Sequence, residues 1–379
     1  MLKLIKISFL IIIVLVGGLL FTKYQNTRTT ILPLPFYFET PYQQSVEATN
    51  AQEADILIIG DRMAKSFMRG FPSIVTQLSK KLKDPLKVYD WSSDKEGIHR
   101  TLAKVRALER MPTVIIYLGG TQEFAEKTFE IKDSKRILGN FNSYEDDKKA
   151  SLIMTAPILS RFLYRSVHYQ KLEKSVISRA PIEDSNGSRQ VQDVMEVTYK
   201  MFHHQWKELL NIVKAKDGKL IAIAPPLNLE VVPKSVCSNS QTQNILIQQN
   251  EITKLVQEKR YKDAYKPARE LSQIAVANSL SFYLLGKIHL GLGNTLKARQ
   301  AFYKAGIFDC TLWRGNIIFN KMIVEEAETR GFEVIDFNLL INKNIGKNEL
   351  FIDKIYPQPL FWERLNDNVY ESLKRLLKL

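Results

Sequence analysis

The sequence predicts an α/β protein built on a three-layer parallel sheet, and two observations support this class. From position 56 onward, short apolar runs rich in β-branched residues alternate with longer stretches of helical periodicity. Such alternation is typical of βαβ units, in which helices cover both faces of a parallel sheet. The composition, 45% hydrophobic and 25% charged over 379 residues, is that of a globular chain with a full core. Disordered and collagen-like classes are thereby excluded.

The first 25 residues predict a membrane anchor. Lys3 and Lys6 precede an uncharged run over residues 7–22, which resembles the start of a secretory signal. The run is short for a spanning helix, which usually needs about 17–25 residues. No clear cleavage site follows, so we expect an uncleaved signal anchor over 1–25, with a cleaved signal peptide as the alternative. The two lysines favour an inner-membrane protein that faces the periplasm of a bacterium.

Beyond the anchor, we expect a linker at 26–54 and an α/β domain made of 55–236 and 311–379, interrupted by an insertion at 237–310. Residues 124–216 are expected to be mainly helical and irregular. Strands are expected at 56–59, 86–91, 113–120, 219–228 and 332–337, with helices at 63–82, 97–110, 316–330 and 359–377.

The insertion contains small residues at a 34-residue period. Ala264 lies 34 positions before Ala298, and a Leu-Gly pair ends at Gly286. This spacing resembles the tetratricopeptide repeat, whose paired helices pack through small residues. We expect an all-α, tetratricopeptide-like insertion of one or two repeats that offers a small binding surface. An ordinary helical hairpin is the alternative.

Two cysteines, Cys237 and Cys310, bracket this insertion. In an oxidising compartment a disulfide between them would close the base of the insertion and contribute about 2–4 kcal/mol through loop closure. Buried free thiols are the alternative. The spacing of cysteines and histidines matches no metal site, so we expect neither a metal nor a cofactor.

Three polar motifs follow strands or precede the last helix. In order and spacing they resemble the Gly-Asp-Ser, Gly-x-Asn-Asp and Asp-x-x-His motifs of the SGNH/GDSL hydrolases, which have a flavodoxin-like sheet. The resemblance covers about 55–123, 219–228 and 316–377. The motifs in this chain are Gly60-Asp61-Arg62, Gly120-Thr121-Gln122-Glu123 and Asp353-Lys354-Ile355-Tyr356.

The departures from the family pattern imply an inactive site. Arg62 stands where the family has its serine nucleophile, and Tyr356 stands where it has its histidine base. Gln122 replaces the asparagine of the oxyanion hole, Asp353 is retained, and Ser92 is the nearest counterpart of the oxyanion glycine. A guanidinium is no nucleophile and a phenol is a poor base at neutral pH, so we expect no ester hydrolysis by the family mechanism.

Two interpretations of the altered site remain open. Arg62 and Asp353 could fill it as a partly buried ion pair. Alternatively, Arg62 could bind an anion such as a carboxylate, a phosphate or an acidic sugar. The candidate ligand-binding residues are Asp61, Arg62, Ser92, Gln122 and Glu123.

The net charge of +14 and the pI near 9.5 indicate an anionic partner. The basic residues are scattered and form no nucleic-acid module, so nucleic acid is not expected. Membrane-anchored relatives of the SGNH type often work beside membrane-bound O-acyltransferases in polysaccharide acetylation or related modification of the cell envelope. The resemblance therefore implies an inactive accessory protein that contacts such an acyltransferase, or an anionic polysaccharide. The alternatives are an active O-acyltransferase or esterase with a non-standard nucleophile, and a structural envelope scaffold that binds through the repeat.

Overall fold

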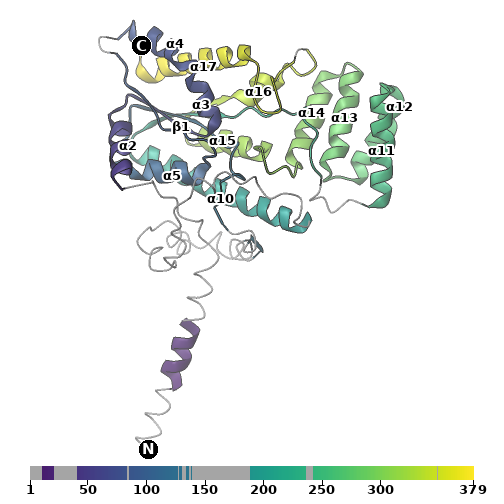
Figure 1. The fold of residues 1–379 in the computed structure, drawn as a ribbon, viewed down its shortest axis with the longest axis horizontal. Coiled ribbons are helices and arrows are strands. Elements are labelled where there is room, and N and C mark those ends of the chain that lie inside the picture. The colour runs from purple at the N-terminus through teal and green to yellow at the C-terminus, as the bar shows by residue number, and fades with distance from the viewer. Residues whose placement is uncertain are drawn as a thin grey trace, which may run out of the picture. The chain divides into compact units, whose positions relative to one another are not determined.

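The computed structural model describes residues 11–20, 41–82, 85–126, 128–129, 134–135, 138, 188–235, 242–347 and 349–379. The chain divides into two compact units, one of residues 1–37 and 127–176 and the other of residues 38–126 and 177–379. The sheet and the helices around it, which Figure 1 shows, belong to the second unit.

The predicted parallel sheet is confirmed. Five strands lie in the order β2-β1-β3-β4-β5, and every neighbouring pair is parallel. All five carboxyl ends therefore lie at one edge of the sheet, where α/β proteins commonly bind ligands. The strands are β1 (Ile56–Gly60), β2 (Val88–Asp90), β3 (Val114–Leu118), β4 (Lys219–Ala224) and β5 (Glu333–Asp336).

Alternate residues of the strands enter two separate cores, which makes the domain three-layered. Ile56 and Ile58 face a core shared with α3 (Arg62–Met68), α4 (Phe71–Ser79) and α17 (Pro359–Leu377). Leu57 and Ile59 face the opposite core. The opposite core is shared with α5 (Ile98–Ala107), α10 (Ser188–Ala215) and α15 (Ile317–Thr329), as Figure 1 shows. A strand buried on both faces must be apolar at every position, which explains the unbroken runs in the sequence.

Two expected segments differ from the structure. The helix expected at 63–82 is two helices, because α4 begins anew at Phe71 with Pro72 in its first turn, and a proline lacks the N–H that a continuous helix would need there. Part of the expected linker is the helix α2 (Pro41–Glu53). Ala51 on this helix is fully buried in the second core, so residues 41–53 belong to the folded domain.

Four successive helices occupy the position of the expected insertion. Each lies against the next, and Figure 1 shows them side by side at the right of the picture, with α14 nearest the sheet. Ala264 and Ala298 are fully buried, and a Cβ at Gly286 would meet the ring of Phe302 at 2.7 Å. Phe302 also belongs to the first core of the sheet, so these helices share a core with the α/β domain. They are α11 (Gln243–Gln257), α12 (Tyr261–Ile274), α13 (Ser279–Gly291) and α14 (Thr295–Ile307).

Within the described part of the chain, no helix is both long and apolar enough to cross a membrane. Of the expected anchor, residues 11–20 are described and are helical. The remainder of residues 1–25, and Cys237, lie outside the described residues. Cys310 is buried, and its predicted bond to Cys237 stays a prediction.

Candidate functional site

The turn after β1 requires a glycine. Gly60 has a φ of +129°, and a Cβ there would lie 2.1 Å from the carbonyl oxygen of Leu118 on the neighbouring strand. Only glycine tolerates both the backbone conformation and this close approach. The turn brings the next residue, Asp61, to the carboxyl edge of the sheet between β1 and β3.

Asp61 is fully buried and ties this turn to the loop after β3. Its Oδ1 accepts a hydrogen bond from the Met63 N–H at 2.8 Å, which caps α3. Its Oδ2 accepts from the backbone N–H of Thr121 at 2.8 Å and from the Thr121 hydroxyl at 2.6 Å. Burial raises the pKa of Asp61 to about 6, and these hydrogen bonds and the charge of Arg62 limit the rise.

Arg62 is the first residue of α3 and is half-buried. Its Nε and Nη2 atoms are covered by protein, yet they have no hydrogen-bond partner among the described residues. The structure therefore places a guanidinium at the candidate site with two buried donors unused.

Gln122 and Glu123 are buried but serve the fold. The Gln122 amide donates to the carbonyl oxygen of its neighbour Thr121 at 2.9 Å, so it is not aimed at an oxyanion position. Both carboxylate oxygens of Glu123 accept from the Ile98 N–H at the start of α5, at 3.1 and 3.0 Å. Burial raises the pKa of Glu123 well above its ordinary value, and the nearby carboxylates add to the rise.

A buried charge cluster, which motif reasoning missed, continues from Glu123 toward α5. The Nε of Arg100 donates to Glu126 at 3.0 Å, and the Nζ of Lys104 lies 2.6 Å from Glu96. Burial raises the pKa of Glu126 to about 7, although Arg100 opposes the rise. The signal in the sequence was present but ambiguous, because charged residues at helical spacing are usually solvent-exposed.

Ser92 lies outside the candidate site's hydrogen-bond network. Its hydroxyl and its backbone N–H both bond to Oδ1 of Asp90, at 2.5 and 3.0 Å. The side chain thus closes the turn that follows β2, and the hydroxyl is already committed as a donor.

One of the two interpretations, an ion pair between Arg62 and Asp353, is not seen in the described structure, where no nitrogen of Arg62 lies within 4.0 Å of an Asp353 oxygen. Asp353 is exposed, and its Oδ1 accepts from the N–H groups of Ile355 and Tyr356 at 2.7 and 2.6 Å. Two backbone donors of its own exposed turn therefore hold this carboxylate. Tyr356 is half-buried and packs against the first core.

The three motifs nevertheless meet around one small cavity of about 10 Å³. Arg62 and Thr121 line it, together with residues 226–228 after β4, 314–315 before α15, and 354–355 of the last motif. Asp353 and Tyr356 are not among its lining residues. The volume is about that of one water-sized group. Sequence reasoning missed Arg314, because no motif marks the loop that carries it.

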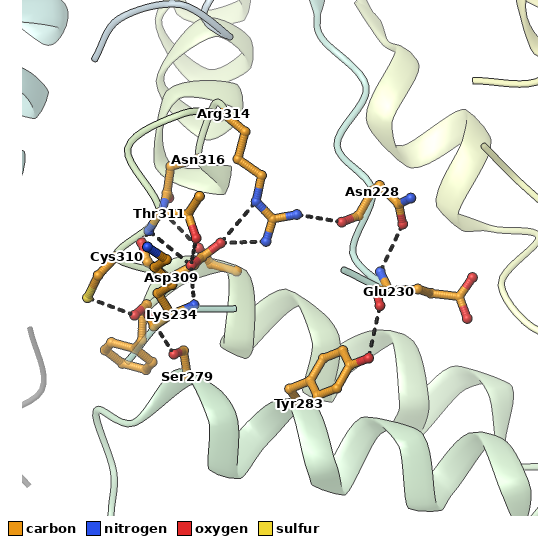
Figure 2. Close-up of polar contacts among 12 residues, drawn as sticks. Asn228, Glu230, Lys234, Ser279, Tyr283, Asp309, Cys310, Thr311, Arg314 and Asn316 are labelled. Carbon is orange, nitrogen blue, oxygen red and sulfur yellow. Dashed lines mark hydrogen bonds and ion pairs between the residues drawn. The ribbon is translucent and has the colours of Figure 1, made fainter. Parts of the chain in front are cut away.

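Arg314 is fully engaged at this cavity (Figure 2). Its Nε and Nη2 donate to Oδ2 of Asp309 at 3.1 and 2.5 Å, and its Nη1 donates to the carbonyl oxygen of Asn228 at 2.9 Å. Lys354, by contrast, is exposed, and within the described ranges it forms no ion pair. The cavity is therefore bordered by two cations, Arg62 and Lys354, that no carboxylate of the described structure pairs directly.

No group of three metal-ligating side chains lies together in the described part of the chain. No protein-family model matches the sequence, and no curated protein matches it. Among solved structures, the chain is similar to a crystal structure described as a "putative acylhydrolase" from Bacteroides fragilis. The two sequences are 8% identical, the alignment covers 90% of this chain and 99% of that chain, and the TM-score is 0.36.

Proposed function

We propose that this protein is a catalytically inactive, SGNH-like accessory protein of the bacterial cell envelope. The observation that carries the proposal is the place of Arg62, the first residue of α3 directly after the Gly60 turn. A serine nucleophile would stand there in an SGNH hydrolase. An arginine keeps its proton at neutral pH and cannot attack an ester carbonyl.

The surroundings of Arg62 support the same conclusion. None of the residues that line the cavity is a histidine, a serine or a cysteine. The Gln122 amide is turned to its own loop, and Asp353 is used by its own turn. A nucleophile, a base and an oxyanion donor are thus all missing from the positions that the family mechanism uses.

The envelope role rests on the sequence. The apolar N-terminal run behind two lysines favours an anchor in the inner membrane with the folded domain in the periplasm. In the proposal, the tetratricopeptide-like helices α11–α14 contact a membrane-bound O-acyltransferase or another envelope protein. The basic surface contacts an anionic polysaccharide that such a system acetylates.

A second candidate, an active esterase or acyltransferase, is favoured by one observation. The Thr121 hydroxyl donates to Asp61 at 2.6 Å, and the pKa of Asp61 is raised to about 6, which suits a general base. Thr121 also borders the cavity beside Arg62. However, Asp61 is fully buried and Thr121 nearly so, and a buried hydroxyl that already holds a capping aspartate is poorly placed to attack a substrate.

An ester-hydrolysis assay separates the two candidates. The full-length protein is incubated with p-nitrophenyl acetate and with an acetylated polysaccharide, and product release is compared with buffer. We expect no release above the buffer background for the wild type or for Arg62→Ser, since no histidine lines the cavity to accept the serine proton. Hydrolysis by the wild type that is lost in Thr121→Val would establish the second candidate instead. Circular dichroism of each variant serves as the folding control.

A further inference from the structure

Two nitrogens of the Arg62 side chain, Nε and Nη2, are buried on one edge of its guanidinium. Nε and Nη2 form the side-on edge of the guanidinium, whose two N–H groups point in parallel and match an oxyanion. Both atoms are buried without a partner among the described residues. Leaving buried donors of a charged group unpaired is costly, so such an edge normally has an acceptor.

Other arginines of this chain show what that edge binds. Arg314 directs Nε and Nη2 to Asp309 (Figure 2), and Arg106 directs them to Glu208 at 3.0 and 2.5 Å. In both cases a single carboxylate oxygen accepts both bonds. Arg375 uses the same two nitrogens on Glu333, at 3.2 and 2.8 Å, with one bond to each oxygen.

The carboxylates around Arg62 are already committed. Asp61, its neighbour in sequence, uses Oδ1 for the Met63 N–H and Oδ2 for Thr121. Asp309 is held by Arg314, and Asp353 by its own turn. None of these three carboxylates pairs with Arg62, whose Nε and Nη2 atoms have no partner among the described residues.

The cavity beside Arg62 has the size and charge to admit the missing acceptor. Its volume of about 10 Å³ accommodates one oxygen atom, which is what Arg106 and Arg314 each use. Lys354 is the exposed residue of its lining and Ile355 is half-buried. A ligand would enter the cavity past the turn that contains Lys354 and Ile355. The Lys354 ammonium would then bind a second oxygen of the ligand.

We propose that this cavity binds the terminal carboxylate of an acidic ligand. The Nε and Nη2 atoms of Arg62 donate hydrogen bonds to it, and Lys354 supplies a second positive charge. The proposal rests on the proposed function, because it assigns a binding role to the position that catalysis would otherwise occupy. A carboxylate is preferred over a phosphate because the Nε and Nη2 atoms of Arg106, Arg314 and Arg375 each hold a carboxylate. A sugar acid meets this description, since its ring would remain outside the cavity.

Binding of D-galacturonate to the full-length protein, measured by titration calorimetry, tests the proposal. Galactose, which lacks the carboxylate, and inorganic phosphate are titrated in parallel. We expect saturable binding of galacturonate and none of galactose, with phosphate binding more weakly than galacturonate. Equal binding of galactose would overturn the carboxylate assignment, and tighter binding of phosphate would show that the site takes a phosphate group instead.

Variants identify the residues responsible. Arg62→Gln should abolish galacturonate binding, and Arg62→Lys should weaken it roughly tenfold because a lysine keeps the charge and loses the two parallel N–H groups. Lys354→Gln, at an exposed position where folding is not at risk, should weaken it as well. Arg364→Gln, at an exposed position of α17, is the matched control and should bind as the wild type does. Unchanged binding in both Arg62→Gln and Lys354→Gln would overturn the proposal.

The outcome is distinguishable from a failure of the proposed function. Ester hydrolysis by the wild type together with Arg62-dependent galacturonate binding would contradict the inactive role and leave the carboxylate site standing. Absence of both hydrolysis and galacturonate binding would contradict the carboxylate site and leave the inactive role standing.

Discussion

Two aspartates of this chain hold similar turns in opposite environments. Asp61 and Asp353 each accept hydrogen bonds from backbone N–H groups two or three residues ahead or across a loop, but Asp61 is fully buried and Asp353 is exposed. Burial determines how much stability is lost when each carboxylate is removed. A lost acceptor in the interior strands its donors away from water, whereas donors in an exposed turn recover water as a partner.

At this scale we predict that Asp61→Ala lowers the free energy of unfolding by about 3 kcal/mol, from the lost helix cap and the two unsatisfied Thr121 donors. Asp353→Ala is the matched control and should cost about 1 kcal/mol or less. Urea denaturation followed by circular dichroism measures both. Equal losses in the two variants would show that burial does not govern these turns.

Among the elements, the junction of β1 with α3 depends on how closely two strands approach. Gly60 lies against the Leu118 carbonyl of β3, so the turn has no room for a side chain. Gly331, after α15, also has a positive φ, +79°, but nothing lies within 4 Å of a Cβ placed there. Alanine substitutions at the two positions therefore distinguish the cost of backbone strain alone from the cost of strain together with a steric clash.

Gly331→Ala should cost about 1 kcal/mol, which is the strain of a left-handed residue. Gly60→Ala should cost about 3 kcal/mol or more, because strain adds to a clash with backbone atoms that cannot rotate away. Thermal unfolding of the two variants beside the wild type measures the difference. A Gly60→Ala variant as stable as Gly331→Ala would mean that β1 and β3 can separate without loss.

At the scale of the whole molecule, the fold buries several carboxyl groups at one edge of the sheet. Burial raises the pKa of Asp61 to about 6 and of Glu126 to about 7, and it raises that of Glu123 as well. In the unfolded chain these groups lose their protons near pH 4. The folded state therefore binds more protons than the unfolded state over the interval between, and its stability falls as the pH rises through that interval.

We predict that the free energy of unfolding decreases from pH 5 to pH 7, by on the order of 1 kcal/mol per pH unit for each group that remains protonated only when folded. Burial lowers the pKa of His204, so the unfolded chain binds more protons than the folded chain at this residue when the pH is below its ordinary pKa. His204 therefore makes stability rise with pH, and it reduces the net decrease caused by the carboxyl groups. Urea denaturation at several pH values measures the curve. Glu126→Gln should flatten it, and a wild-type stability that rises from pH 5 to pH 7 would contradict the prediction.

The sequence by itself located β1 and β3, because strands buried on both faces are apolar at each position whatever surrounds them. It also singled out Gly60 and Asp61, but it offered Asp61 as a ligand-binding candidate, whereas the structure uses this carboxylate to cap α3 and to hold Thr121. It misplaced α2, because the helix is polar overall and Ala48 and Ala51 give little periodic signal.

The partners of the site residues were decided by the tertiary structure. Arg62, Thr121, Arg314 and Lys354 come from four distant segments, and only the crossing of their loops at the carboxyl edge brings them around one cavity. The sequence offered Asp353 as the partner of Arg62, whereas the folded chain commits Asp353 to its own turn and leaves the Arg62 edge unpaired. The physical reason is that local hydrogen bonds follow from spacing along the chain, but an ion pair across the chain depends on where the loops finally lie.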